Sequence, residues 1–257
     1  MEKKALLIGI NYVGTNNALN GCINDQHSLR DFLVDNRYFS ESEMTLLNDK
    51  EATVKPTKSN ILSQFEEMVK FSEKHKDKKE VFLFISYSGH GSHIKDCDGD
   101  EEDGRDEVLC PSDCRTNGYI SDDLIKSQLI DKLYENVKLL ILMDCCHSGT
   151  IVDLRYNYLE NVDNYTVFGK TKENQCRVVM ISGCKDTQTS ADAYIKRKFQ
   201  GAMTASFLSA YDDKITYKNL INEMRKYLKR GNYSQVPQLS SSFVLEIEGN
   251  TILDSFN

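Results

Sequence analysis

A histidine and a cysteine, each placed just after an apolar run, are the residues of this chain best suited to chemistry. His90 follows the run at residues 81–87, and Cys146 follows the run at 138–143. A free thiol with a pKa of about 8.5 is only about 3% thiolate at pH 7, and a neighbouring imidazole raises that fraction by taking up the proton. The same imidazole can later protonate a leaving amine. The pair therefore indicates a thiol protease, with His147 as an alternative base because it adjoins Cys146.

Side-chain alternation distinguishes between the two adjacent cysteines. Long apolar runs are typical of buried parallel strands, and open α/β sheets place their sites at the carboxyl ends of such strands. If extended geometry continues past each strand, Ser88 and His90 project to one face, as do Asp144 and Cys146. Cys145 then points to the other face. We therefore expect Cys146 to be the nucleophile, with the Asp144 carboxylate beside it.

Strand and helix patterns alternate along the chain. Strands are expected at residues 5–10, 44–47, 81–87, 138–143, 177–181 and 243–247, and helices at 22–36, 57–74, 121–134, 202–211 and 217–229. Thr57 or Ser59 is the candidate N-cap of the helix at 57–74, and Ser121 is that of the helix at 121–134. This alternation predicts a mainly parallel sheet with helices on both faces. Residues 150–175 are polar and rich in Asn and Tyr, which is typical of a linker.

Composition excludes several classes of protein. A length of 257 residues fits one large α/β domain or two small ones. The net charge of −7 argues against nucleic-acid binding, and no run approaches the ~18 apolar residues that span a membrane. The eight cysteines are scattered rather than arranged as a disulfide framework. We therefore expect a cytoplasmic protein with no nucleic-acid or membrane partner.

Several motifs, taken together, resemble those of the metacaspases, a family of caspase-like cysteine peptidases. The matching segments are YSGHGS around His90, DCCHSGT around Cys146, GCIND at 21–25, SGCKDTQTSADA at 182–193 and QVPQLSSS at 235–242. They follow the family's order through nearly the whole chain, and the animal-caspase signature Gln-Ala-Cys-x-Gly is absent. The resemblance is to the simple type I-like architecture, without an N-terminal prodomain.

The resemblance implies an α/β fold, a caspase-like three-layer sandwich whose mainly parallel six-stranded sheet has helices on both faces. Residues 1–257 would form a single caspase-like peptidase domain, with a large-subunit-like part (about 1–153), a linker (about 154–175) and a small-subunit-like part (about 176–257). His90 would be the general base and Cys146 the nucleophile. The backbone N–H groups of Gly91 and Cys146 would form the oxyanion hole.

The resemblance also implies cleavage after Arg or Lys rather than after Asp. The residues that match the family's S1 pocket are Cys22, Asp25, Ser88 and Asp144. Two carboxylates in a partly desolvated pocket favour a cation and penalise an acidic side chain. The alternative for Asp25 is a charge that only stabilises a helix N-terminus. The expected partners are protein or peptide substrates with Arg or Lys at P1, and the resemblance favours a monomer.

A calcium site is the metal site that the resemblance implies. Its ligands would be Asp106, Asp122, Asp123 and Asp153. Clustered carboxylates repel one another until a hard cation with oxygen ligands joins them. Ca²⁺ bound there would order the loop that follows Cys146, so it is the expected activator. No organic cofactor is expected.

Two other metal sites are alternatives. The acidic segment 96–107 resembles an EF-hand loop in part, but Glu101 replaces the invariant glycine, and the segment can equally be a solvated acidic loop. The EF-hand ligands would be Asp96, Asp98, Asp100 and Glu107. The candidate soft ligands for zinc are His93, Cys97, Cys110 and Cys114. The chain lacks the paired Cys-x2-Cys knuckles that are typical of a structural zinc site.

The leading hypothesis is a calcium-stimulated cysteine endopeptidase specific for Arg or Lys. The alternatives are a catalytically silent caspase-like scaffold and a calcium- or zinc-binding regulatory domain. Intact His90 and Cys146 favour the enzyme. Self-cleavage is possible after Lys170 or Lys172 in the linker or after Arg177 at its end, and all three can equally be ordinary surface residues.

Overall fold

The fold is that of a computed structural model. It describes residues 1–95, 105–145, 151–158, 164–167, 176–183, 192–195, 198–252 and 254, and within these ranges the side chains of residues 105, 192–195 and 198 are not described.

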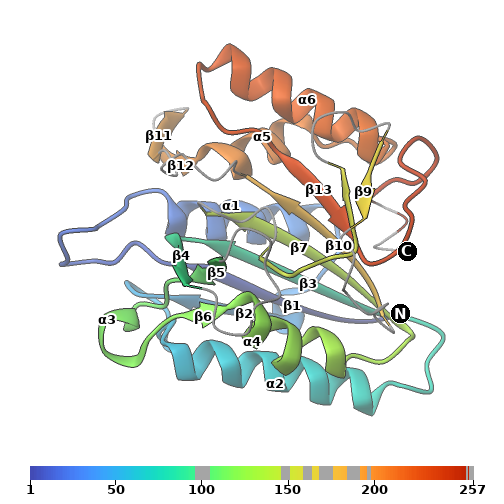
Figure 1. The fold of residues 1–257 in the computed structure, drawn as a ribbon, viewed down its shortest axis with the longest axis horizontal. Helices are drawn as coiled ribbons and strands as arrows, with labels where there is room; N and C mark the ends of the chain where they lie inside the picture. Colours follow the sequence, from blue (N-terminus) through green and yellow to red (C-terminus); the bar gives the residue numbers. More distant parts are fainter. Residues whose placement is uncertain are drawn as a thin grey trace.

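Eight strands form the central sheet, in the order β2-β1-β3-β7-β10-β13-β8-β9 (Figure 1). The first five are parallel to one another. They are β2 (Met44–Asn48), β1 (Glu2–Gly9), β3 (Val81–Ser88), β7 (Val137–Asp144) and β10 (Arg177–Ser182). The last three join by antiparallel pairing. They are β13 (Gln238–Ser241), β8 (Tyr156–Tyr158) and β9 (Thr166–Val167).

The expected six-stranded sheet is therefore wrong in number and at one edge. β8 and β9 lie in the polar segment expected to be a linker, and strands of three and two residues leave no apolar run to signal them. The final strand is Gln238–Ser241 rather than 243–247. Its Gln and Ser side chains are buried, whereas Val244 in the apolar run that follows is 51% exposed. Because the residues of this strand are mostly polar, a prediction based on hydrophobic runs does not find it.

Alternation along the parallel strands divides the core into two layers, one on each face of the sheet. Odd-numbered residues of β3 and β7, such as Ile85 and Ile141, pack with α2 (Lys58–Lys74) in what we call the α2-side core. Even-numbered residues, such as Phe84 and Leu140, pack with α1 (Cys22–Asp35), α5 (Ala202–Ala210) and α6 (Tyr217–Arg230) in the α1-side core. The three-layer arrangement is confirmed (Figure 1).

The helices begin largely where their caps predict. The hydroxyl of Thr57 accepts the N–H of Asn60 ahead of α2, and the hydroxyl of Ser121 accepts the N–H of Leu124 ahead of α4 (Asp122–Gln128). The expected helix at 121–134 is shorter than predicted, and η2 (Ile130–Lys132) follows α4. In the described part of the chain, every helix is too short or too polar to cross a bilayer.

Two groups of short strands that are absent from the expected pattern lie near the carboxyl ends of the parallel strands (Figure 1). β4 (Gly91–Lys95), β5 (Arg105–Leu109) and β6 (Ile120–Ser121) form a small antiparallel sheet. β11 (Asp192–Ile195) and β12 (Lys198–Gly201) form a hairpin that leads into α5. The remaining elements are η1 (Glu41–Glu43) and α3 (Cys114–Asn117).

Candidate active site

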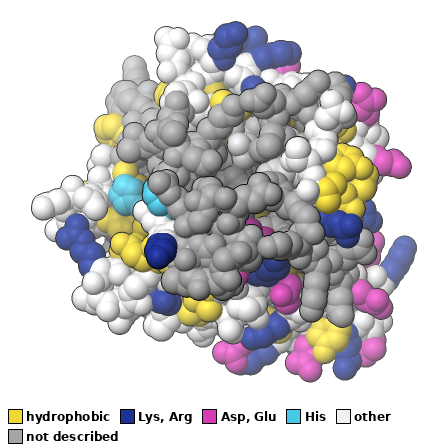
Figure 2. Space-filling view, viewed as in Figure 1, with side chains coloured by type: hydrophobic (Ala, Val, Ile, Leu, Met, Phe, Trp, Pro, Cys, Tyr) yellow, Lys and Arg dark blue, Asp and Glu magenta, His cyan; other side chains and the backbone are white. Residues whose placement is uncertain are grey.

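The register of β3 against β7 brings together the two strand ends that precede His90 and Cys146. Ser88 pairs with Asp144 as the last residue of each strand, and the N–H of Gly89 donates to the carbonyl of Asp144 over 3.3 Å. His90 is half-buried two residues beyond Ser88. Cys146 and His147 lie outside the described residues. Figure 2 shows histidine side chains reaching the surface beside residues that are not described.

Cys145 is unsuited to attack a peptide substrate. Its side chain is 0% exposed and belongs to the α2-side core, with Tyr87 and Met143. A thiol enclosed by apolar side chains is disfavoured as a thiolate and inaccessible to a peptide bond. This position agrees with the alternation argument, and the role of Cys146 stays a prediction.

A backbone carbonyl orients the ring of His90. Its Nε2 lies 2.8 Å from the carbonyl oxygen of Asn17. Because a carbonyl only accepts hydrogen bonds, Nε2 carries the proton of the neutral ring and Nδ1 carries the lone pair. The ring also packs on Tyr12, with ring centroids 4.6 Å apart. Asn17 and Tyr12 were missed in the sequence, since a backbone carbonyl and a stacked ring have no spacing signature.

The chain does not continue as an extended strand from Ser88 to His90. β3 ends at Ser88, Gly89 forms a bend, and β4 begins at Gly91. The assumption that places Ser88 and His90 on one face therefore fails. Gly91, the expected oxyanion donor, begins β4 and pairs with Leu109.

The four residues expected to form the S1 pocket lie at the same end of the sheet, on its α1 side. Cys22 and Asp25 belong to the first turn of α1, and Ser88 and Asp144 end their strands; all four are buried. The carboxylates of Asp25 and Asp144 converge on Gly201. A β-carbon placed on that glycine would lie 2.7 Å from Asp25 Oδ2 and 2.1 Å from Asp144 Oδ2.

The N-terminus of α5 holds both carboxylates. The N–H of Gly201 donates to Asp25 Oδ1 and Oδ2 over 2.9 and 3.0 Å. The N–H and the hydroxyl of Thr204 each donate to Asp144 Oδ2 over 2.8 Å. These N–H groups are unused by the helix itself, and their partial positive charge favours ionised carboxylates. Gly201 and Thr204 are functional candidates that sequence reasoning missed.

Three of the four expected calcium ligands cluster in the structure. Asp106, Asp122 and Asp123 each offer a carboxylate oxygen, and these atoms lie within 4.8 Å of one another. The carboxylate of Asp122 accepts the N–H of Asp123 over 2.8 Å and that of Glu107 over 2.9 Å. Burial is the main cause that raises the pKa of Asp122 to about 8; the charges of Asp153 and Glu107 add to this effect, and the two hydrogen bonds oppose it.

This cluster fits a hard divalent cation. Asp153 is close enough for its charge to act on Asp122, so the fourth expected ligand belongs to the same neighbourhood. Its backbone has φ 44°, a conformation that costs energy in a residue other than glycine. Buried carboxylates that repel one another are relieved by a cation with oxygen ligands, and Ca²⁺ prefers such donors.

Comparisons with known proteins decide the family. Residues 3–155 match the family described as "Metacaspase, peptidase C14 domain". The chain belongs to the metacaspase family. It is 36% identical to Metacaspase-1A of Neurospora crassa over 96% of this chain and 64% of the relative, and 37% identical to Metacaspase-1 of Yarrowia lipolytica over 96% and 63%. This metacaspase chain thus spans just under two thirds of these relatives' length.

Two solved structures confirm a caspase-like fold for this metacaspase. Protein GSU0716 of Geobacter sulfurreducens superposes with a TM-score of 0.66 at 24% identity, over 96% of this chain and 95% of that one. The structure described as pro-sf-caspase-1 superposes with a TM-score of 0.53 at 10% identity, over 95% and 88%.

The alternative metal sites receive little support from the described residues. Cys97 lies outside them, as do Asp96, Asp98 and Asp100. The described chain on either side of the acidic segment forms strands β4 and β5 rather than the helices of an EF-hand. Among the described side chains, the group of three or more potential metal ligands is the cluster of Asp106, Asp122 and Asp123.

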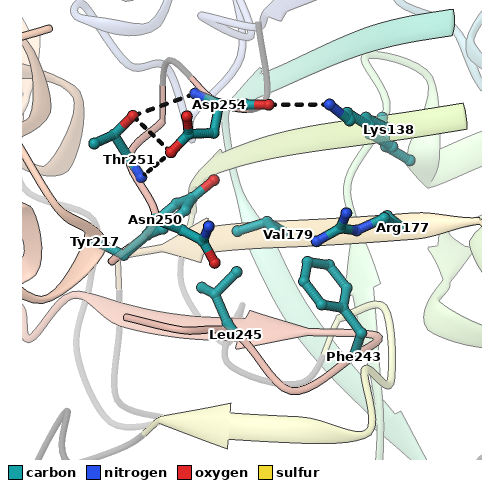
Figure 3. A pocket seen from close by; sticks show the side chains of 10 residues that line it. Lys138, Arg177, Val179, Tyr217, Phe243, Leu245, Asn250, Thr251 and Asp254 are labelled. Carbon is teal, nitrogen blue, oxygen red and sulfur yellow. Dashed lines mark hydrogen bonds between the residues drawn. The ribbon is translucent and has the colours of Figure 1, made fainter. Parts of the chain in front are cut away.

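Arg177 is poorly placed for self-cleavage. It begins β10, where it pairs with Lys138 of β7, and the next residue, Val178, is fully buried. Its guanidinium lies 4.2 Å above the ring of Phe243, beside a cavity of about 360 Å³ (Figure 3). This cavity is at the amino ends of β7 and β10, opposite the strand ends near His90. Lys170 and Lys172 lie outside the described residues.

Proposed function

We propose that the protein is a cysteine endopeptidase that cleaves after Arg or Lys, with Cys146 as nucleophile and His90 as general base, and that Ca²⁺ stimulates it. The register of β3 against β7 supports this proposal, because Ser88, two residues before His90, pairs with Asp144, two residues before Cys146. Membership of the metacaspase family supports the reaction class.

The Asn17 hydrogen bond determines which nitrogen of His90 acts. Nδ1 takes the thiol proton of Cys146, and the thiolate attacks the carbonyl carbon of the scissile bond. Backbone N–H groups of Gly91 and Cys146 donate to the oxyanion. Nδ1 then protonates the leaving amine as the C–N bond breaks. Water, losing a proton to Nδ1, then attacks the carbonyl carbon of the resulting thioester; the C–S bond breaks, and Nδ1 returns the proton to the Cys146 thiolate.

The two buried carboxylates at Gly201 provide the basis for selectivity at P1. The carboxylates of Asp25 and Asp144 are both buried, and in this proposal they present their negative charge to the P1 side chain of the substrate. A guanidinium or ammonium group gains charge-assisted hydrogen bonds there, whereas a P1 Asp meets repulsion and loses its hydration.

For calcium, the residues that would hold the ion are Asp106, Asp122, Asp123 and Asp153. The ion would neutralise their mutual repulsion when bound. Asp153 follows Cys146 by seven residues. Fixing Asp153 in the cluster restrains the chain that leaves the nucleophile, and this is the route by which binding would raise activity.

The test uses fluorogenic peptides that differ only at P1, with Arg, Lys or Asp, in the presence of Ca²⁺ or a chelator. We expect turnover of the Arg and Lys peptides that depends on Ca²⁺, and little or no turnover of the Asp peptide. Cys146→Ala should abolish turnover, and the matched control Cys145→Ala should retain it. Preferential turnover of the Asp peptide would refute the S1 assignment, and activity in Cys146→Ala would refute the nucleophile.

A further inference from the structure

The loop at residues 10–20, between β1 and α1, contacts His90 at both its ring and its backbone. The carbonyl oxygen of Asn17 accepts a hydrogen bond from Nε2 of His90 over 2.8 Å. The hydroxyl of Tyr12 accepts the backbone N–H of His90 over 2.8 Å. The Tyr12 ring packs on the imidazole at a centroid distance of 4.6 Å and an interplanar angle of 36°. One loop therefore restrains the position and the plane of this imidazole.

Two buried tyrosine hydroxyls enclose the backbone of His90. Tyr12 accepts its N–H and donates to the carbonyl of Cys110 over 2.6 Å. Tyr87 donates to the carbonyl of His90 over 2.9 Å and lies 3.2 Å from the Tyr12 hydroxyl. The N–H of Cys110 also donates to the His90 carbonyl over 3.1 Å. Both backbone polar groups of His90 are thus held by groups that are themselves fixed.

Gly89 permits this close approach. A β-carbon on this residue would lie 2.8 Å from the Tyr87 hydroxyl oxygen and 3.0 Å from that of Tyr12. Both distances are too short for a side chain, so the two hydroxyls and the turn before His90 require a glycine at this position.

Tyr12 itself is held in a costly conformation. Its φ of 51° lies in the left-handed region, which a bulky residue rarely adopts. The carboxylate of Asp49 accepts the N–H groups of Asn11 and Val13, on either side of Tyr12, over 2.9 Å each. The side chain of Tyr12 is only 6% exposed. Strain that the surroundings maintain in this way is concentrated at functional sites.

We propose that Tyr12 is a positioning residue: its hydroxyl and its ring together hold the imidazole of His90 in the orientation that receives the proton of the nucleophile. The inference rests on the proposed role of His90 as general base. Tyr12 acts through His90 and does not touch the substrate.

The hydroxyl keeps this role across the working pH range. Burial raises the pKa of Tyr12 well above its ordinary value of 10, so the group stays protonated and both accepts from His90 and donates to Cys110. Without the hydroxyl, the N–H of His90 and the carbonyl of Cys110 would each lose a partner, and the turn could move. A displacement of about 1 Å in a reacting group can lower a rate by roughly 10²-fold.

The experiment compares Tyr12→Phe, which keeps the ring, with Tyr12→Leu, which removes both contacts. We expect kcat for an Arg peptide to fall about tenfold in Tyr12→Phe and about a hundredfold in Tyr12→Leu, with KM within about twofold of wild type. The rate of alkylation of Cys146 by iodoacetamide at pH 6 to 7 should fall in the same order, because this rate measures the thiolate without any peptide.

Tyr158→Phe is the matched control. The hydroxyl of Tyr158 is also buried and accepts a backbone N–H, that of Leu245, over 2.9 Å, but it belongs to β8, the strand next to the edge strand β9 and four places from β3 in the sheet. Tyr158→Phe should lower the melting temperature as Tyr12→Phe does, and it should leave kcat unchanged. If the Tyr12 variants do not fold, Asp49→Ala provides the second test, since it releases the loop without removing Tyr12, and the same fall in kcat is expected.

The outcomes separate this inference from the proposed function. Wild-type kcat and alkylation rate in a folded Tyr12→Phe, together with an inactive His90→Ala, overturn the role of Tyr12 and leave the peptidase assignment intact. Full activity in His90→Ala overturns both. An equal loss of kcat in Tyr158→Phe shows that general destabilisation explains the effect, and it also overturns the positioning role.

Discussion

The carboxylates of Asp25 and Asp144 both converge on Gly201, although they come from α1 and from the end of β7. Each lies within 2.7 Å of the position that a β-carbon on Gly201 would occupy. Gly201→Ala should therefore force the carboxylates apart and disturb the start of α5. We expect kcat/KM for P1 Arg peptides to fall at least tenfold, and the free energy of unfolding to fall by about 1–3 kcal/mol, as overpacking does elsewhere.

Gly249→Ala is the control for this prediction. A β-carbon there meets nothing closer than 3.5 Å. This variant should keep wild-type kcat/KM and stability in the same peptide assay and in urea unfolding. Wild-type behaviour of Gly201→Ala would show that the carboxylates can separate freely and that the pocket is more adaptable than this geometry indicates.

Removing one charge from the pair separates substrate binding from the dyad. In Asp144→Asn the amide oxygen can still accept from Thr204, so the local structure is retained while the charge is lost. We expect kcat/KM for Arg and Lys peptides to fall roughly 30-fold or more, chiefly through KM, because losing one partner of a buried charge pair costs on the order of 2–5 kcal/mol. Alkylation of Cys146 by iodoacetamide should keep its wild-type rate. A loss of alkylation instead would assign Asp144 to the dyad.

Strand periodicity in the sequence predicts one part of the site correctly. β3 and β7 are continuous apolar runs, so the strands and their ends can be placed from the sequence, while their pairing, with Ser88 beside Asp144, comes from the structure. Caps at Thr57 and Ser121 have local signatures and are confirmed. β4, β5 and the β11–β12 hairpin were missed, since they are short and several of their residues are polar.

The contacts that hold the site in place could not be predicted for a different reason. The Asn17 carbonyl and the N–H of Gly201 act through the backbone, and any residue type supplies such groups. Tyr12 lies far from His90 in sequence, and its hydroxyl gives no indication of its partner until the loop at 10–20 is folded. Tertiary contacts between a loop and a strand end have no periodicity that could reveal them.

The acidic cluster predicts how stability depends on pH. Asp122 has an ordinary pKa of 3.8 and a pKa of about 8 in the folded chain. The folded state therefore holds this proton where the unfolded state has released it, and stability of the metal-free protein should fall as pH rises between these values. Ca²⁺ competes with the proton, so added Ca²⁺ should raise the melting temperature more at pH 8 than at pH 5.

Asp122→Asn tests the source of this effect. Without the ionisable group, the metal-free variant should lose much of the pH slope, and its melting temperature should no longer rise with Ca²⁺. Asp131→Asn, which removes an exposed carboxylate outside the cluster, should behave as wild type. Thermal unfolding at pH 5 and pH 8, with Ca²⁺ or with chelator, measures both quantities. An equal Ca²⁺ response in both variants would place the ion elsewhere.

Gly89→Ala should separate the geometry of the dyad from the binding of substrate. The added methyl group would meet the hydroxyls of Tyr87 and Tyr12, which hold the two backbone groups of His90. Either the hydroxyls or the turn must move, so we expect kcat for an Arg peptide to fall by about a hundredfold. KM should change little, because Asp25 and Asp144 lie on the other face of the sheet from Tyr87. Steady-state kinetics distinguishes this from Asp144→Asn, which should act on KM. A Gly89→Ala protein that folds and loses affinity rather than turnover would contradict the view that this turn positions the base.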